Sequence, residues 1–258
     1  MASASSSSSA SRPAKRGRKK QDKHEAEEPD DETAATKMAK IKTSEEVLKK
    51  KMKLSPVVVF AHGAGVPSSS DWMIRWKSML AKGLQAVAVV TFDYPYISGG
   101  KKRAPPKAEK LVDFHVKVVK KAVAEYPGHP LVLIGKSMGS RVSCMVAGEE
   151  GIGASAIICL GYPLKGMNGA VRDETLLQLE APTMFVQGDK DGLCPLDKLE
   201  AVRKKMKSVN ELHVIEGGDH SFKIAKKNLQ LKGTTQEEAE DHAVNAIAMF
   251  VSRFIGGM

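Results

Sequence analysis

Long apolar runs are missing from this chain of 258 residues. A membrane-spanning helix needs about 20 consecutive apolar residues, and a secretory signal needs a shorter apolar region behind a basic N-terminus. The sequence contains neither pattern. We therefore expect an intracellular protein without a membrane segment, located in the nucleus, the cytoplasm or both.

Cysteine is also scarce, with three residues at positions Cys144, Cys159 and Cys194. Their spacing matches no metal-ligand pattern, and they fall in segments that we predict as a helix, a strand and a turn. Small buried residues are the favoured interpretation. We therefore expect neither a metal site nor a cofactor.

Residues 1–53 contain few aromatic residues and few clustered β-branched ones. Such a composition cannot repay the entropy lost on folding, so we predict a disordered tail here and a folded domain over residues 54–258. An amphipathic helix over residues 43–53 is one candidate exception within the tail.

The tail carries the basic run Lys15–Lys20, which is suited to a nuclear import receptor or to loose phosphate contacts. A solvated tail without a destination is one alternative, and an organellar transit peptide is a less favoured one. The net charge of +10 is divided about equally between residues 1–53 and the rest of the chain. No concentrated basic face is evident, so we expect no specific nucleic-acid binding.

The rest of the chain alternates strand and helix patterns, which is typical of an α/β fold with a mostly parallel sheet and helices on both faces. We predict six strands, at residues 56–61, 86–92, 130–134, 154–160, 182–187 and 211–215. Helices are expected at residues 71–82, 106–126, 138–148, 196–207 and 236–254. Trp72 and Trp76, four apart on the first helix, are expected in the core.

The pentapeptide Gly135-Lys136-Ser137-Met138-Gly139 directly follows the third predicted strand and precedes a predicted helix. In a nucleophile elbow of the form G-x-S-x-G, the serine lies on a tight strand-to-helix turn that leaves its hydroxyl exposed. Ser137 is therefore the candidate nucleophile. Because the same pattern also arises in ordinary glycine-rich turns, its partners must decide the interpretation.

Candidate partners follow in the order Asp, then His, that this elbow architecture uses. The segment Gly188–Pro195 is the turn after a predicted strand and holds Asp189 and Asp191, and His220 lies in the loop after the next strand. The carboxyl ends of parallel strands meet at one edge of the sheet, so these side chains can reach Ser137. We favour Asp191 as the carboxylate, with Asp189 as the alternative.

Proton chemistry assigns the roles, because a serine hydroxyl becomes a good nucleophile when a neighbouring base removes its proton. The imidazole of His220, with an ordinary pKa of about 6.5, is the predicted base, and the aspartate would orient it. The glycine loop His62–Gly65 follows the first strand. We predict that the backbone N–H groups of Ala64 and Met138 form an oxyanion hole, and that His62 has a structural role.

Four motifs in this order, HGAG, GKSMG, GDKDGLCP and GGDHSF, resemble the α/β-hydrolase superfamily. With the segments VVVFAHGAG and FDYPYISGGKKRAPP, the chain more narrowly resembles the testis-expressed protein 30 and NSL-complex-subunit-3 family, which is related to dienelactone hydrolases. The resemblance covers about residues 54–256 and implies an α/β-hydrolase fold with Ser137, Asp191 and His220 in the triad positions. Some relatives act as subunits of chromatin complexes. Little strand-like sequence precedes Pro56, so we expect a shortened sheet.

The region where related hydrolases often insert a helical lid is short, with about 21 residues between Leu160 and Pro182. We therefore expect no large lid and a pocket for small or protruding groups. The loop with Lys101, Lys102 and Arg103 also follows a strand, so we take these residues as candidates for binding an acidic substrate. A solvated basic loop is the alternative.

These predictions describe a serine hydrolase that cleaves a small ester, thioester or amide through an acyl-enzyme, without cofactor or metal. The alternative is a non-catalytic hydrolase-fold interaction module in a nuclear or chromatin-associated assembly.

Overall fold

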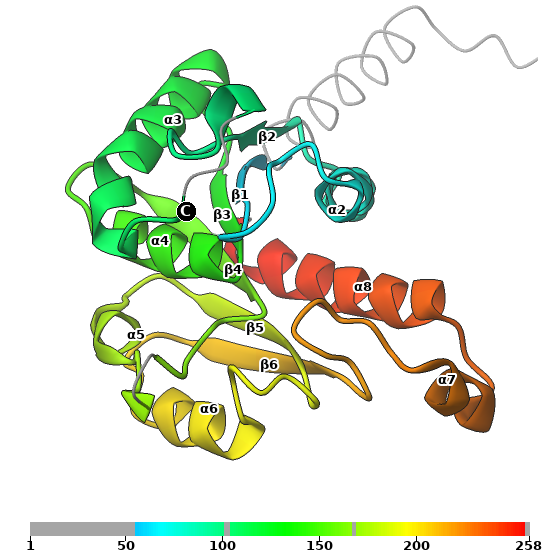
Figure 1. Cartoon of the computed structure of the whole chain (residues 1–258). Coiled ribbons are helices and arrows are strands. Elements are labelled where there is room, and N and C mark those ends of the chain that lie inside the picture. Colours follow the sequence, from blue (N-terminus) through cyan, green and yellow to red (C-terminus); the bar gives the residue numbers. More distant parts are fainter. Residues whose placement is uncertain (1–54, 101–103, 167–168, 256–258) are drawn as a thin grey trace, which may run out of the picture. The chain divides into compact units, whose positions relative to one another are not determined.

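Six parallel strands form the centre of the protein (Figure 1). The computed structural model describes residues 55–100, 104–166 and 169–255, which all belong to one compact unit. The predicted disordered tail, its basic run Lys15–Lys20, the candidate helix at 43–53 and the loop residues 101–103 lie outside the described residues.

The strand order in the sheet is β2-β1-β3-β4-β5-β6, and every neighbouring pair is parallel. The strands are β1 (Val57–Ala61), β2 (Ala88–Phe92), β3 (Leu131–Lys136), β4 (Ala154–Leu160), β5 (Thr183–Gly188) and β6 (Asn210–Ile215). Each lies within about two residues of its predicted position. The interior strand β1 is fully buried, as expected for a parallel strand that is covered on both faces.

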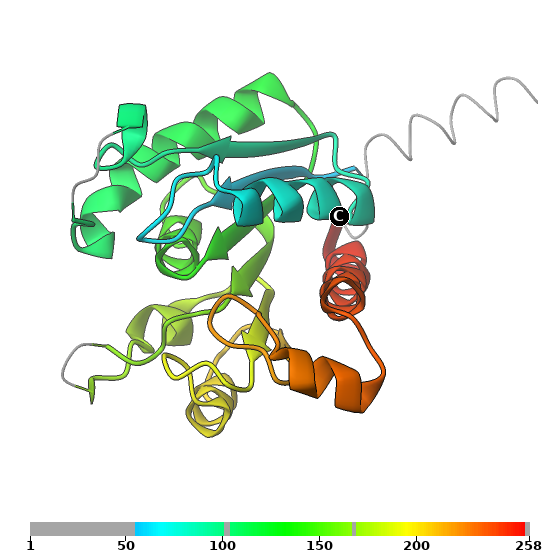
Figure 2. The same cartoon turned by 45° about the vertical axis from the view of Figure 1, so that its right-hand side comes forward.

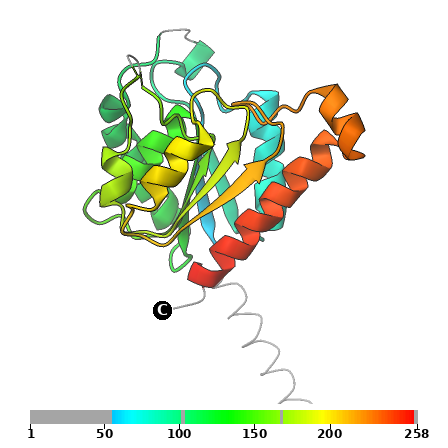
Figure 3. The same ribbon diagram turned by 90° about the horizontal axis from the view of Figure 1, so that it is seen from below.

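Helices cover both faces of this sheet, and Figure 3 shows the two layers on either side of the strands. One layer consists of α2 (Asp71–Gly83) and α8 (Gln236–Ile255), and the other of α3 (Val112–Glu125), α4 (Met138–Ala147), α5 (Glu174–Gln178) and α6 (Leu196–Arg203). A further helix, α7 (Lys226–Lys232), lies beyond the N-terminal end of α8 (Figure 2). This arrangement confirms the predicted fold class.

Side chains of one strand alternate between the two helical layers, because successive residues of a strand point to opposite faces. In β3, Val132 and Ile134 join the apolar cluster under α2 and α8, whereas Leu131 and Leu133 join the cluster under α3 and α4. The core is therefore two apolar layers separated by the sheet.

The direction of chain travel reverses between β1 and β3. From β1 the chain goes outward to the edge strand β2, returns to β3 on the other side of β1, and then proceeds outward to β6. Loops that follow β1 and β3 consequently leave the sheet in opposite directions, and ligands of open α/β sheets bind in the crevice at such a point. The glycine loop and the G-x-S-x-G turn both begin here.

Four helical segments differ from the sequence-based expectation. The short helices α5 and α7 were not predicted, because five and seven residues are too few for a clear helical period. The predicted helix over 106–126 begins as a 3-10 turn, Ala108–Leu111, before α3. Helix α6 ends at Arg203 instead of Lys207, because the side-chain amide of Asn210 donates a hydrogen bond to the Arg203 carbonyl.

Helix α8 begins with a reciprocal capping box. The Glu238 N–H donates to Thr235 Oγ1 (3.1 Å), and the Thr235 N–H donates to Glu238 Oε2 (3.0 Å). Over the described parts of the chain, no helix combines the length and the apolar character that a membrane span requires.

Our first prediction concerns the core residue Trp76, which is fully buried with its ring 5.4 Å from that of Phe222. Trp76→Ala should lower the free energy of unfolding by about 3–5 kcal/mol, because it leaves a large cavity. Ile74→Ala is a matched control on the same helix, since Ile74 is 55% exposed, and it should change stability by less than about 0.5 kcal/mol. Urea denaturation measures both, and equal effects would contradict the described packing.

Candidate active site

Ser137 lies on a strained turn between the end of β3 and the start of α4. Its backbone has φ 52° and ψ −117°, a conformation that L-residues rarely adopt. The glycines two residues on either side make this turn possible by close approach of the backbone. A Cβ atom at Gly135 would lie 2.3 Å from the nitrogen of Ser140, and one at Gly139 would lie 2.5 Å from the carbonyl oxygen of His62. The sequence motif thus corresponds to a real steric requirement.

The side chains of Ser137, His220 and Asp191 form one continuous chain of hydrogen bonds. His220 Nε2 lies 2.8 Å from Ser137 Oγ, and His220 Nδ1 lies 2.7 Å from Asp191 Oδ2. With Nδ1 carrying the proton toward the carboxylate, Nε2 accepts the hydrogen bond from the serine hydroxyl. The three residues come from the loops after β3, β5 and β6, at the carboxyl ends of the strands.

The carboxylate of Asp191 is buried and accepts two further hydrogen bonds. The Leu193 N–H donates to Oδ1 (2.8 Å), and the side-chain amide of Gln187 donates to Oδ2 (2.5 Å). Burial alone would raise the pKa of Asp191, but the hydrogen bonds to its carboxylate, led by that of His220, outweigh burial and lower the pKa. Asp191 is therefore held as an anion beside the imidazole.

Asp189, the alternative carboxylate, has a different place in the same turn. Its Oδ1 accepts a hydrogen bond from the Gly217 N–H (2.6 Å), and its Oδ2 lies 3.5 Å from the ammonium of Lys190. The structure thus brings Asp191 to His220 and uses Asp189 to join the turn after β5 to the loop after β6.

The loop that carries His220 is tied down by backbone and side-chain contacts. The Lys190 N–H donates to the Gly218 carbonyl (2.9 Å), and Asp219 Oδ1 accepts hydrogen bonds from the N–H groups of Ser221 and Lys223. Phe222, at φ 68°, is fully buried in the core next to Trp76. These contacts fix the position of His220 at the carboxyl-terminal edge of the sheet.

The glycine loop after β1 lies beside Ser137. A Cβ atom at Gly63 would be 3.4 Å from the Cβ of Ser137. Buried His62 holds this loop, because its Nε2 accepts from the Tyr94 N–H (3.1 Å) and its Nδ1 donates to the Gly63 carbonyl (2.6 Å). Burial lowers the pKa of His62 and keeps it neutral. The hydroxyl of Tyr96 donates to the Ala64 carbonyl (2.9 Å).

These placements give the arrangement its chemical capacity. A serine hydroxyl is hydrogen-bonded to an imidazole, and the imidazole is hydrogen-bonded to a carboxylate. Helix α4 begins at the residue after the serine. The first backbone N–H groups of a helix have no partner within it and favour nearby negative charge. Such a set suits attack on a carbonyl carbon followed by stabilisation of the resulting oxyanion. That the N–H groups of Met138 and Ala64 hold this oxyanion stays a prediction.

The cysteines and the candidate substrate-binding residues are not part of the hydrogen-bonded chain from Ser137 to Asp191 in the described structure. The three cysteines are fully buried. Burial raises the pKa of Cys159, and it raises the pKa of Cys194 to about 12, so these two thiols are poor nucleophiles. The candidate substrate-binding residues Lys101, Lys102 and Arg103 lie outside the described residues.

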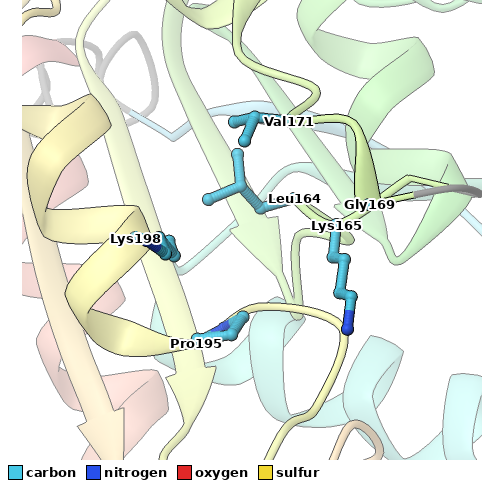
Figure 4. A pocket seen from close by; sticks show the side chains of 6 residues that line it. All are labelled: Leu164, Lys165, Gly169, Val171, Pro195 and Lys198. Carbon is cyan, nitrogen blue, oxygen red and sulfur yellow. The ribbon is translucent and has the colours of Figure 1, made fainter.

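A pocket of 190 Å³ lies beside the turn that carries Asp191 (Figure 4). Leu164 and Val171 form one wall, Pro195 and Lys198 at the start of α6 form another, and the residues that line it do not include Ser137 or His220. Its connection to that turn is a hydrogen bond from the Lys165 N–H to the Leu193 carbonyl (2.8 Å). This pocket therefore neighbours the hydrogen-bonded chain without containing it.

Two residues at the site were missed in the sequence. Gln187 closes an apolar strand, and its spacing of four residues from Asp191 was the only available signal. Lys136 is 7% exposed and was considered only as the variable residue of the G-x-S-x-G motif. Its signal was a charge at the end of an otherwise apolar buried strand.

The comparison with known families agrees with this geometry. The sequence profile of the alpha/beta hydrolase domain family matches residues 55–252. The chain belongs to this family. The family assignment covers the whole described sheet and all three residues of the hydrogen-bonded chain.

Solved structures with the same fold are distant in sequence. An esterase of Pyrococcus furiosus has a TM-score of 0.60 at 16% identity, with 79% of this chain and 84% of that chain covered. A dienelactone hydrolase of Anabaena variabilis has a TM-score of 0.55 at 18% identity, covering 78% and 85%. The type II thioesterase of the borrelidin biosynthetic cluster has a TM-score of 0.53 at 16% identity, covering 76% and 93%. At these identities the likeness establishes the shared fold.

Our second prediction tests the steric requirement at the turn. Gly139→Ala should lower the free energy of unfolding by about 1–3 kcal/mol, because the new methyl group would meet the backbone oxygens of Ala61 and His62 at 2.6 and 2.5 Å. Gly148→Ala, at the end of the same helix, is the control. Its Cβ would lie 3.4 Å from the Met145 carbonyl oxygen, and we expect a change below about 0.5 kcal/mol. Denaturation curves of the two variants decide; equal stability would refute the close approach.

Proposed function

We propose that this protein is a serine hydrolase that cleaves a small ester, thioester or amide through an acyl-enzyme. The observation that supports this most strongly is the hydrogen-bonded chain from Ser137 through His220 to Asp191. Membership of the alpha/beta hydrolase domain family supports it independently.

In the first half of the proposed reaction, Ser137 Oγ attacks the carbonyl carbon of the substrate. His220 Nε2 removes the hydroxyl proton as the new bond forms, and Asp191 stabilises the resulting imidazolium. The N–H groups of Met138 and Ala64 would donate hydrogen bonds to the negatively charged carbonyl oxygen. His220 then passes the proton to the leaving alcohol, thiol or amine, and the acyl group stays on Ser137.

In the second half, a water molecule replaces the leaving group. His220 takes a proton from the water as its oxygen attacks the acyl carbon, and a second tetrahedral oxyanion forms. Collapse of this intermediate breaks the bond to Ser137 Oγ, which recovers its proton from His220. The products are a carboxylic acid and the free enzyme, so no redox step or cofactor enters the reaction.

The short connection between β4 and β5 supports a preference for small substrates. Among its described residues, the five-residue α5 is the one α-helix. Long acyl chains need a deep apolar tunnel, and a short connection offers little material to build one. The names of the structural neighbours, an esterase, a dienelactone hydrolase and a thioesterase, agree with ester or thioester cleavage.

We also infer a narrower relationship, to the testis-expressed protein 30 and NSL-complex-subunit-3 family, from the segments VVVFAHGAG and FDYPYISGGKKRAPP together with the motifs HGAG, GKSMG, GDKDGLCP and GGDHSF. Some members of that family serve in chromatin complexes, and the basic run Lys15–Lys20 is suited to an import receptor. If Ser137 shows no nucleophilic reactivity, the alternative function is favoured, in which the protein is a non-catalytic interaction module with a hydrolase fold.

Our third prediction concerns the nucleophile. A fluorophosphonate probe should label the wild-type protein, and Ser137→Ala should abolish labelling and lower kcat on a short-chain ester by about 10⁶-fold. Ser143→Ala is the matched control, because Ser143 lies on the same helix and its buried hydroxyl has no hydrogen-bond partner within the described structure. Equal labelling of wild type and Ser137→Ala would eliminate Ser137 as nucleophile.

Our fourth prediction separates the two aspartates. Asp191→Asn should lower kcat by about 10⁴-fold, because an amide cannot accept the Nδ1 proton of His220 in the same way and favours the wrong tautomer. Asp189→Asn keeps an oxygen for the Gly217 N–H and should cost far less. Steady-state kinetics on one ester compares them, and the reverse order of effects would reassign the carboxylate.

A further inference from the structure

Lys136 is a buried cation on an apolar face of the sheet. It follows Val132 and Ile134 at intervals of two residues on β3, so its side chain lies on the side of α2 and α8. Val132 and Ile134 belong to the apolar cluster on that side, whereas Lys136 is 7% exposed. Burying an ammonium group costs free energy unless strong partners compensate, so its presence calls for a physical reason.

The partners of Lys136 converge from the loop that carries His220 and from α2. Its Nζ donates a hydrogen bond to the backbone carbonyl of His220. The same atom lies 5.2 Å from the ring centroid of Phe222 and 5.6 Å from that of Trp72, which is within the range of cation–π attraction. The ammonium group thus contacts the loop after β6 at His220 itself, the proposed base.

Gly161, which directly follows β4, provides the space for this contact. It has φ 65°, and a Cβ atom there would lie 2.7 Å from Lys136 Nζ and 3.1 Å from the His220 carbonyl oxygen. The same atom would be 3.6 Å from Cε1 of the His220 ring. The absence of a side chain at this position therefore allows lysine, carbonyl and imidazole to lie together.

We propose that Lys136 is a positioning residue whose ammonium group holds the His220 carbonyl and so aims the imidazole Nε2 at Ser137 Oγ. The proposal rests on the proposed hydrolase function. It assigns a role to the residue directly before Ser137. Two adjacent residues at the end of β3 would then contact His220, Ser137 at the imidazole and Lys136 at the backbone carbonyl.

The charge state of Lys136 makes this role sensitive to pH. Burial lowers the pKa of its ammonium group to about 8, against the opposing attraction of the carboxylates of Asp191 and Asp219. Among the described residues, these two carboxylates and His220 are the titratable groups that face it, from the loops after β5 and β6. Helix α2 contributes the uncharged ring of Trp72. Above about pH 8 the group becomes neutral, and its cation–π attraction and its charge-assisted hydrogen bond weaken.

Our fifth prediction is tested by the kinetics of Lys136→Met, which fills the same space without charge. We expect kcat on a short-chain ester to fall by about 10²-fold while KM changes less than about twofold, because a misplaced base slows the chemical step rather than binding. Wild-type kcat/KM should decline above about pH 8, and the variant should lack that decline. The proposal would be overturned if Lys136→Met had the same kcat as wild type and the same decline of kcat/KM above about pH 8.

Two controls exclude a general loss of structure. Lys136→Met removes a buried charge in favour of an apolar group, so we expect its Tm to stay within a few degrees of the wild-type value. Lys77→Met removes an exposed lysine that lies 3.4 Å from Thr91 Oγ1, and its activity and pH profile should match those of wild type. If Lys136→Met instead unfolds, the NMR experiment below is made at a temperature at which it remains folded.

A second measurement does not depend on catalysis and separates failure of this proposal from failure of the proposed function. The Nδ1 proton of His220, hydrogen-bonded to Asp191, gives an NMR resonance that is assigned by its loss in His220→Gln. We expect it in wild type and in inactive Ser137→Ala, and expect it shifted or lost in Lys136→Met. An unchanged resonance in Lys136→Met would overturn the positioning role. A protein inactive in all forms whose resonance still responds to Lys136→Met would refute the enzyme and retain the positioning role.

Discussion

The close approach of two backbone segments is the constraint on which the site depends. The helix after Ser137 begins so near the end of β1 that Gly139 has no room for a side chain, and Gly135 on β3 is equally restricted by the turn itself. This contact places the turn that carries Ser137 against the glycine loop that begins at His62. It arises at the point where the chain changes direction between β1 and β3, so the sheet topology and the placement of the serine have one cause.

Two buried polar side chains at this edge, Asp191 and His62, have hydrogen-bond partners on all of their polar atoms. Asp191 accepts hydrogen bonds from two side chains and a backbone N–H, and His62 uses both ring nitrogens on backbone groups. An unpaired group in such surroundings would cost the desolvation free energy of that group. The network therefore has few alternative arrangements, which is what a base held within hydrogen-bond distance of a serine requires.

Much of the fold was predictable from the sequence, because buried parallel strands are short apolar runs and the helices between them have a clear period. The placement of Ser137 was predictable for a local reason, since only a glycine-flanked turn fits at this position. The two aspartates were harder to rank, because they are two residues apart in one turn. Their order depends on which carboxylate faces the loop after β6, and that direction is a tertiary property. Gln187 escaped notice for the same reason.

Lys136 shows where a sequence pattern conceals a contact. Read as the variable position of a motif, it has no assigned function, and read by strand alternation it belongs in an apolar layer. Its partners, the His220 carbonyl and the ring of Trp72, are 84 and 64 positions away in the sequence, so only folding brings them together. Successive side chains at the end of a strand point to opposite faces of the sheet. One residue can therefore carry the proposed nucleophile while the residue before it holds the loop of the proposed base. The alternation that builds the two core layers thus also allows β3 to serve both ends of the serine–histidine hydrogen bond.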